Sequence, residues 1–232
     1  MTLLTSHPET ARLVAFVSLL ALFAFFEHRW PRRPLTVSKS RRWLVNLLIV
    51  VVDTAVARMI LPIAPIALAA LAQSRGWGLF NLAGLDGILP LVASILLLDL
   101  VIYGQHRFFH RTPLLWRLHR MHHTDLDLDV SSGTRFHPLE IILSLFIKLV
   151  TVLLLGAPPL AVLLFEMVLN ATSLFNHANL RLPLALDRWL RLIVVTPDMH
   201  RVHHSVIVRE TDSNFGFNLP WWDRLFETYT AQ

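Results

Sequence analysis

The sequence contains no cysteine. This absence excludes disulfide bonds, thiolate-bound zinc, cysteine-held iron–sulfur clusters and a haem with a thiolate ligand. Any metal ion must therefore be held by nitrogen or oxygen atoms. The sequence also has no G-x-G-x-x-G run and no G-x-x-x-x-G-K-[ST] run, so it shows neither a dinucleotide fingerprint nor a P-loop. Electrons for a redox reaction would have to come from a partner.

Charged residues are also scarce. They make up 16% of the 232 residues, whereas hydrophobic residues make up 54%. A soluble domain has about 25% charged residues, so this composition predicts a membrane protein. The length allows a single compact domain, residues 1–232. Within it we expect residues 1–98 to be mainly a membrane anchor and residues 99–232 to carry the chemistry.

Three apolar runs, Ala11–Phe26, Trp43–Ala72 and Leu85–Tyr103, predict membrane-spanning helices. The second run would be about 45 Å long as one helix, which exceeds the roughly 30 Å hydrocarbon core. We therefore expect it to bend at Pro62 and Pro65, because proline interrupts a helix.

Two shorter apolar runs, 139–155 and 160–174, follow, and the sequence "GAPP" joins them. This pattern predicts a helical hairpin that either spans the membrane or dips into it. The expected fold is therefore all-α: an integral membrane helical bundle with about four spans, or three spans plus the hairpin. A histidine-rich helical cap would cover its cytosolic end.

The distribution of basic residues predicts the orientation. Six Lys or Arg residues lie between His28 and Trp43, whereas only Arg75 lies between Gln73 and Asp86. Because cytoplasmic connections are enriched in Lys and Arg, the first connection is expected inside and the second outside. Every histidine from His106 onward would then lie on the cytoplasmic side.

Histidines recur in the pattern H-x-x-H-H, once in "LHRMHH" and once in "MHRVHH", and two more occur in "HRFFH". Residues three or four positions apart share one face of a helix, so the imidazoles of each cluster can point into one space. The "FNHAN" sequence adds His177 as a ninth candidate. The clustered candidates are His106, His110, His119, His122, His123, His200, His203 and His204.

Neutral imidazole is a common metal ligand. An open four- to six-coordinate ion takes roughly four or five protein ligands, so nine imidazoles suit two metal ions better than one.

Polar residues on the apolar helices lead toward these histidines in steps of three and four. Asp99 and Tyr103 precede His106, and Glu166 and Asn170 precede His177. We interpret them as hydrogen-bonding support for the metal ligands, with ordinary interhelical hydrogen bonding as the alternative. Further candidates for this role are Asp125, Asp198 and His137, the last of which could instead begin a helix.

The C-terminal "NFGFNLPWWDRLFETY" has the composition of an aromatic belt at headgroup depth. Trp221 and Trp222 could alternatively form a wall of the substrate entrance. The net charge of +5 fits orientation on anionic lipid or docking of an acidic electron carrier. Nothing suggests a nucleic-acid partner, because the basic residues lie beside the membrane spans.

From residue 99 to residue 229 the sequence resembles the fatty acid hydroxylase/sterol desaturase superfamily of membrane oxygenases. The motifs "HRFFH", "LHRMHH", "RFHPLE", "NHANL", "PDMHRVHHS" and "NFGFNLPWWDRLFETY" carry the resemblance and stand in the family's order. The resemblance implies that the eight clustered histidines bind two iron ions, and His177 matches a further family histidine. It also implies O2 and two externally supplied electrons as co-reactants.

The expected function is therefore O2-dependent, non-haem di-iron hydroxylation or desaturation of a fatty acyl, sterol-like or other membrane lipid. A separate electron-transfer protein would be a partner, and zinc could replace iron in a purified sample. The alternative is a membrane metal transporter or another metal-binding protein without oxygenase activity, which would need ligands at the middle of the bilayer. A b-type haem carrier would need paired histidines within the spans.

Overall fold

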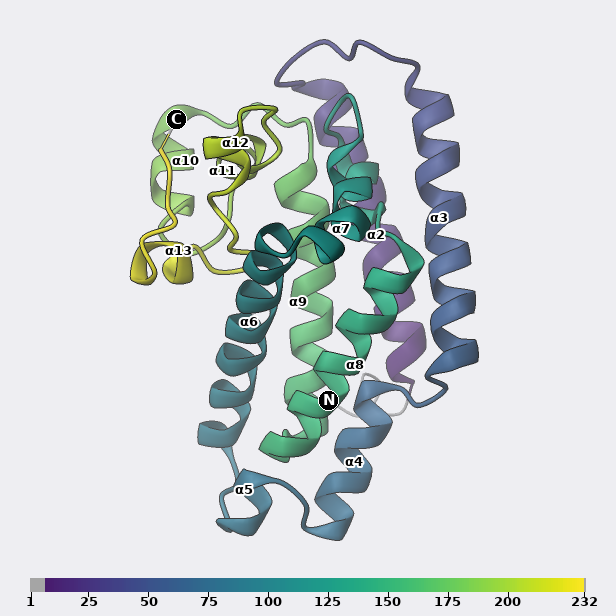
Figure 1. Ribbon diagram of the computed structural model, residues 1–232, viewed down its shortest axis with the longest axis vertical. Helices are drawn as coiled ribbons and strands as arrows, with labels where there is room; N and C mark the ends of the chain where they lie inside the picture. Colours follow the sequence, from purple (N-terminus) through teal and green to yellow (C-terminus); the bar gives the residue numbers. More distant parts are fainter. Residues whose placement is uncertain (1–6, 232) are drawn as a thin grey trace.

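A computed structural model describes residues 7–231, and its regular elements are helices apart from one isolated bridge between Pro31 and Leu180. Five described stretches are long and apolar enough to cross a membrane. They are Pro8–Arg29, Lys39–Leu82, Ile88–Arg111, Pro138–Leu155 and Pro159–His177. These features confirm the predicted all-α membrane bundle (Figure 1).

Several of the helices begin with proline in the first turn, where its missing N–H has no intrahelical acceptor to lose. The elements in chain order are α2 (Pro8–Arg29), α3 (Lys39–Ile60), α4 (Pro65–Arg75), α5 (Leu79–Leu82), α6 (Ile88–Arg111), α7 (Pro113–His123), the 3-10 helix η1 (Val130–Thr134), α8 (Pro138–Leu155), α9 (Pro159–His177), α10 (Leu184–Leu190), α11 (Pro197–His203), α12 (Val208–Thr211) and α13 (Trp221–Leu225).

The predicted bend in the second apolar run is confirmed. Helix α3 ends at Ile60, residues 61–64 are not helical, and α4 begins at Pro65. The predicted hairpin is also present as α8 and α9, whose 18 and 19 residues are long enough to cross a membrane. Gly156 ends α8 in the left-handed conformation, with φ of 65°, which a residue without a side chain adopts without strain.

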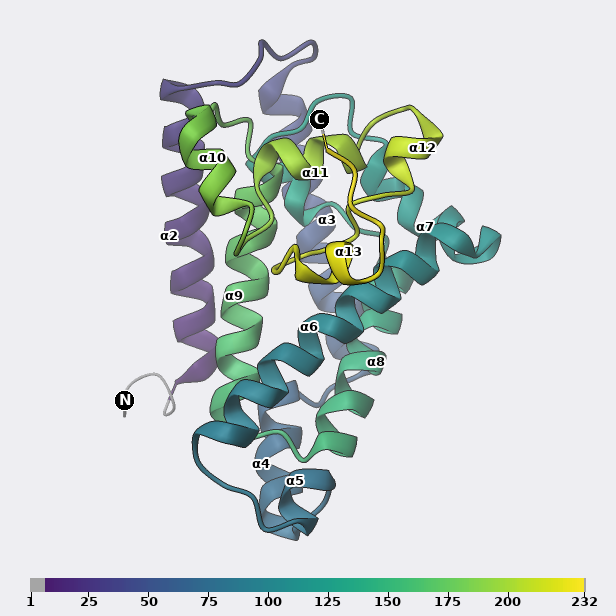
Figure 2. The same cartoon turned by 90° about the vertical axis from the view of Figure 1, so that its left-hand side faces the viewer.

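The connections lie at two ends of the bundle (Figure 1). Residues 30–38, residues 112–137 and the segment after residue 177 lie at one end, whereas residues 76–87 and 156–158 lie at the other. Figure 2 shows α10, α11 and α13 gathered at the first end, beside the end of α9. All histidines from His106 onward therefore belong to one end of the bundle, as a shared site requires.

Helix α9 packs against α2, α4 and α6 and also contacts η1 and α11. Its buried side chains Val162 and Phe165 join a core with Leu98 of α6 and Val152 of α8. This packing fixes the height of His177, the last residue of α9, relative to the other histidines.

The first two helices also hold the loop between α7 and η1. The Arg42 guanidinium of α3 lies 2.6 Å from Asp125 and 2.6 Å from Asp129, and it donates to Ser132 Oγ at 3.0 Å. Glu27 of α2 accepts from the backbone N–H of Val130 at 2.9 Å. Residues 1–98 thus include groups that position the loops of the histidine end.

Replacing Arg42 with Met should destabilise the protein by about 3–5 kcal/mol, because it leaves two buried carboxylates without their cation. Arg42 and Asp129 side chains are 9% and 0% exposed. The measurement is thermal unfolding of the purified protein in detergent. Arg41→Met, at the exposed neighbouring position, is the matched control and should melt like the wild type. Equal melting temperatures for both variants would contradict the account.

Candidate metal centre

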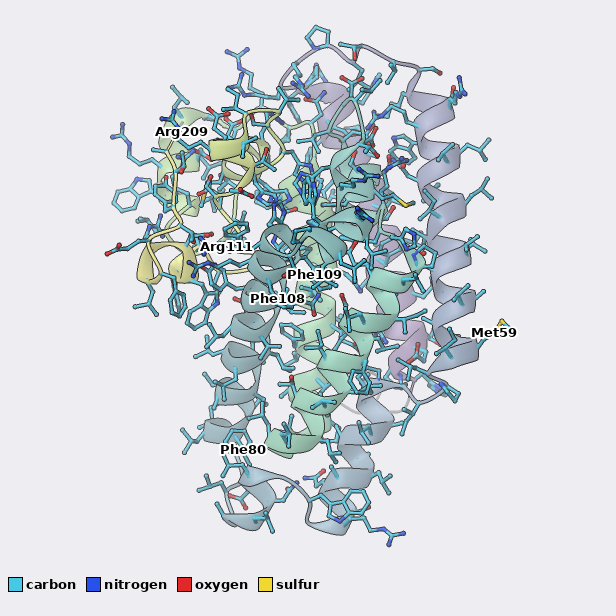
Figure 3. The ribbon with its side chains drawn as sticks, viewed as in Figure 1. Met59, Phe80, Phe108, Phe109, Arg111 and Arg209 are labelled. Atoms are coloured by element: carbon cyan, nitrogen blue, oxygen red, sulfur yellow. The ribbon has the colours of Figure 1, made fainter. Side chains whose placement is uncertain are left out.

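The nine candidate histidines form two adjacent groups. The five-imidazole group contains His106, His110, His119, His123 and His203, and the four-imidazole group contains His122, His177, His200 and His204. In each group, one ring nitrogen from every histidine lies within 4.8 Å of the others. Figure 3 shows side-chain nitrogen atoms gathered at this end of the bundle, above Phe109 on α6.

The H-x-x-H-H spacing divides each cluster between the two groups. Helix α7 gives His119 and His123, which are four positions apart, to the five-imidazole group and His122 to the other. The second cluster, on α11, does the reverse: only His203 joins the five-imidazole group. The groups are in contact, since the ring centroids of His123 and His204 are 4.3 Å apart.

Four of the imidazoles direct Nδ1 at a backbone carbonyl oxygen at distances between 2.7 and 3.0 Å. A carbonyl oxygen can only accept a hydrogen bond, so Nδ1 must carry the proton. Nε2 of a neutral ring is then bare and presents a lone pair. The pairs are His106 with Phe215, His122 with Arg135, His177 with Ser173 and His203 with Ser213.

These bare nitrogens face one another. Nε2 of His122 lies 3.0 Å from Nε2 of His177, although both rings use their Nδ1 proton for a carbonyl. No hydrogen bond can form between two neutral acceptors, so the contact is repulsive unless a cation is shared. Nε2 of His203 and both ring nitrogens of His110 have no hydrogen-bond partner among residues 7–231. An all-imidazole set of this kind fits metal ions with borderline-soft character, such as iron or zinc.

Burial keeps the extramembrane imidazoles neutral. Desolvation lowers the pKa of each of the six imidazoles from the two H-x-x-H-H clusters well below its ordinary value. The neutral ring is the form that binds a metal ion. The six are His119, His122, His123, His200, His203 and His204.

Glu140 is a site residue that our interpretation of the sequence missed. Its Oε1 lies 2.7 Å from Nδ1 of His119, and it is 3% exposed. Such a carboxylate orients the imidazole and raises its basicity toward a metal ion. The available signal was its position in "RFHPLE", one turn into a helix that starts beside the histidine end. Asp212, 3.4 Å from Nδ1 of His110, gave no comparable signal.

The loop 213–217, whose carbonyl oxygens accept from His106 and His203, is held by Asp223. Its two carboxylate oxygens accept from the N–H groups of Phe215 and Gly216 at 2.7 Å each. Burial raises the pKa of Asp223 to about 6. The sequence did not indicate this loop, because the acceptors are main-chain atoms.

The seven residues predicted to support the imidazoles have other partners in the structure. None of them forms a hydrogen bond to a clustered imidazole within residues 7–231. Six of them form hydrogen bonds to other groups: Asp99 accepts from Trp222, Tyr103 bonds Thr228, Asp125 accepts from Arg42, Asp198 accepts from Arg32, Glu166 accepts from Lys148, and His137 accepts from Leu139 N. The seventh, Asn170, lines a cavity.

His137 therefore caps the start of α8, which is the second of the two roles considered for it. Trp222 donates through Nε1 to Asp99 at 2.8 Å, and Trp221 donates to the carbonyl of Leu192 at 2.7 Å. Both tryptophans thus attach α13 to its neighbours, and neither lines the large cavity described below.

A fatty acid hydroxylase family model matches residues 91–228, which is more than half of the chain. The protein belongs to the fatty acid hydroxylase family. The matched residues include all nine histidines of the two groups. The resemblance found in the histidine motifs is therefore confirmed.

Three curated relatives illustrate the range of the family. The chain is 33% identical over 138 residues to ornithine lipid hydroxylase OlsE of Rhizobium tropici, covering 60% of the chain and 41% of the relative. It is 29% identical over 163 residues to human alkylglycerol monooxygenase, covering 68% and 34%. It is 30% identical over 154 residues to a cholesterol 25-hydroxylase-like protein of Danio rerio, covering 63% and 59%. The matches thus span less than two thirds of each relative, and no solved structure matches the chain.

Replacing Glu140 with Leu should lower the affinity of the five-imidazole group for metal ions by about 10–100-fold, because His119 loses its hydrogen-bond acceptor. Glu140→Gln keeps a carbonyl oxygen at this position and should lose less. Titration of the metal-loaded protein with a competing chelator measures both. An affinity for Glu140→Leu equal to that of the wild type would show that the contact does not support metal binding.

Proposed function

We propose that the protein is an O2-dependent membrane lipid hydroxylase whose nine imidazoles hold two metal ions, iron in the working enzyme. The observation that carries this proposal is that the five-imidazole group, which contacts the four-imidazole group, adjoins a lipid-sized cavity. His106 and His119, both members of the five-imidazole group, line its inner end.

The cavity has a volume of about 620 Å³ and runs between α2, α3, α4, α6, α8 and α9. Small-molecule sites usually enclose about 300–1,000 Å³. Most of the wall is apolar and comes from helices long enough to cross a membrane, with Phe16, Leu145 and Leu169 among its side chains. A lipid could therefore enter from the bilayer and present a C–H bond beside the imidazoles without exposing its chain to water.

The metal ligands, the groups that orient them and the cavity wall contribute to the proposed reaction in different ways. The imidazoles bind the ions, the carbonyl oxygens and Glu140 fix the ring orientations, and the apolar wall positions the lipid and excludes water. When bound, the two ions would supply the O2 activation and electron transfer that side chains cannot provide. The overall reaction converts a lipid C–H bond, O2, two electrons and two protons to an alcohol and water.

Electrons would come from a separate electron-transfer protein, because the sequence has no dinucleotide fingerprint. The excess of Lys and Arg in the first connection supports a cytoplasmic position for the histidine end. Zinc could occupy the imidazoles of a purified sample, since it binds them more tightly than ferrous iron. Metal identity in one preparation is therefore a weak guide to the working metal.

The relatives support hydroxylation rather than desaturation, since they are named as hydroxylases and a monooxygenase. Those names refer to an ornithine lipid, an alkylglycerol and cholesterol. The transporter alternative has less support, because its ligands would follow a path through the bundle. Here both imidazole groups lie at one end of the bundle.

Replacing His122 or His203 with Ala should reduce lipid hydroxylation to the level of membranes that lack the protein, because each change removes a ligand from one group. The measurement is incorporation of ¹⁸O from ¹⁸O2 into membrane lipids, resolved by mass spectrometry. His28→Ala changes an exposed histidine outside both groups and should retain full activity. Full activity in either ligand variant, or no labelled lipid with the wild type, would overturn the proposal.

A further inference from the structure

Besides Glu166 Oε2, which lies 3.1 Å from Arg12, three buried acceptor oxygens of cavity-lining residues have no hydrogen-bond partner among residues 7–231. They are Oδ1 of Asp53 on α3, Oε2 of Glu140 on α8 and Oε1 of Gln105 on α6. Asp53 and Glu140 are 5% and 3% exposed. Glu140 uses its other oxygen for His119 and Gln105 uses its amide nitrogen for Ser144. The unpaired polar atoms of these three side chains are therefore hydrogen-bond acceptors, so a ligand at this position would have to donate.

Asp53 and Glu140 lie on helices that pack together, and both line the cavity. A buried carboxylate without a cation is costly, and a second carboxylate nearby increases the cost. Asp53 lies outside residues 91–228, the part that matches the family. The family match therefore does not account for this buried carboxyl group in an apolar helix.

The cations that line the cavity are engaged at its other end. Glu166 lies 3.1 Å from Arg12 and 2.6 Å from Lys148, and Arg58 lies 3.4 Å from Glu9. Glu166 is eleven residues before His177, which corresponds to about 16 Å along α9. Lys148 is eight residues after Glu140, or about 12 Å along α8. Neither Asp53 nor Glu140 pairs with a Lys or Arg side chain among residues 7–231.

We propose that the inner end of the cavity binds a primary ammonium group of the substrate between Asp53, Glu140 and Gln105. An ammonium carries three N–H donors, which match the three unused acceptors, and its positive charge is attracted by the carboxyl groups. This inference rests on the proposed function and narrows it: the substrate is a lipid with an amine-bearing headgroup. The carbon atoms next to the amine then lie beside His106 and His119, and the hydrocarbon chain occupies the apolar wall.

The test compares two probes with the same chain, dodecylamine and N-dodecylacetamide, at pH 7. The amide keeps the length of the chain but has no charge. Binding of radiolabelled probes to the purified, metal-loaded full chain in detergent should favour the amine by about tenfold or more, because hydrogen bonds to charged groups are about twice as strong as neutral ones. Tenfold corresponds to about 1.4 kcal/mol.

Asp53→Asn should remove most of this preference, and Asp53→Glu should restore part of it. Glu9→Gln is the matched control, because it removes a carboxylate from the outer end of the same cavity and should leave the preference unchanged. Equal binding of both probes by the wild type overturns the inference without reference to any variant. An unchanged preference in correctly folded Asp53→Asn also overturns it.

Failure of this inference can be distinguished from failure of the proposed function. A protein that labels a lipid with ¹⁸O but binds both probes equally is a hydroxylase without an ammonium site. A protein that prefers the amine but never labels a lipid has the ammonium site without the proposed activity.

Discussion

Neutral imidazoles that donate from Nδ1 to a carbonyl oxygen must present a bare Nε2 to whatever they face, and in this protein they face one another. The 3.0 Å approach of His122 and His177 is the clearest case, since a main-chain acceptor fixes the proton of each ring. Only a shared cation turns this repulsion into a bond. The main-chain acceptors therefore contribute to the proposed metal site as much as the histidines do.

The rest of the fold keeps these acceptors and rings in place. Asp223 holds the loop that supplies two of the carbonyl groups, and the Arg42 network holds the loop that precedes η1. Arg32 donates to Asp198 at the start of α11 at 3.0 Å. These contacts connect the membrane helices at the start of the chain to the histidine end, so the anchor also supports the site.

The features that depend on hydrophobic periodicity and on residue chemistry, namely the helices and the histidine clusters, could be predicted from the sequence. The apolar runs predicted the long helices, and Pro62 and Pro65 predicted the break before α4. The three- and four-residue spacings predicted that the histidines of each cluster face one space, and the structure gathers nine of them in two adjacent groups. The sequence did not predict their division into groups, because that depends on how α7 and α11 pack against α6 and α9. For the polar stripes the structure favours the alternative of interhelical hydrogen bonding: Asp99 accepts from Trp222 of α13, and Glu166 accepts from Lys148 of α8.

The central claim is that two adjoining imidazole groups each bind one metal ion. The most direct measurement is the iron content per chain after anaerobic reconstitution and removal of loosely bound metal. The account predicts two iron ions per wild-type chain and one in His200→Ala, which removes a ligand only from the four-imidazole group. A wild-type chain that binds no iron, or an His200→Ala chain that still binds two ions with unchanged affinity, would contradict it.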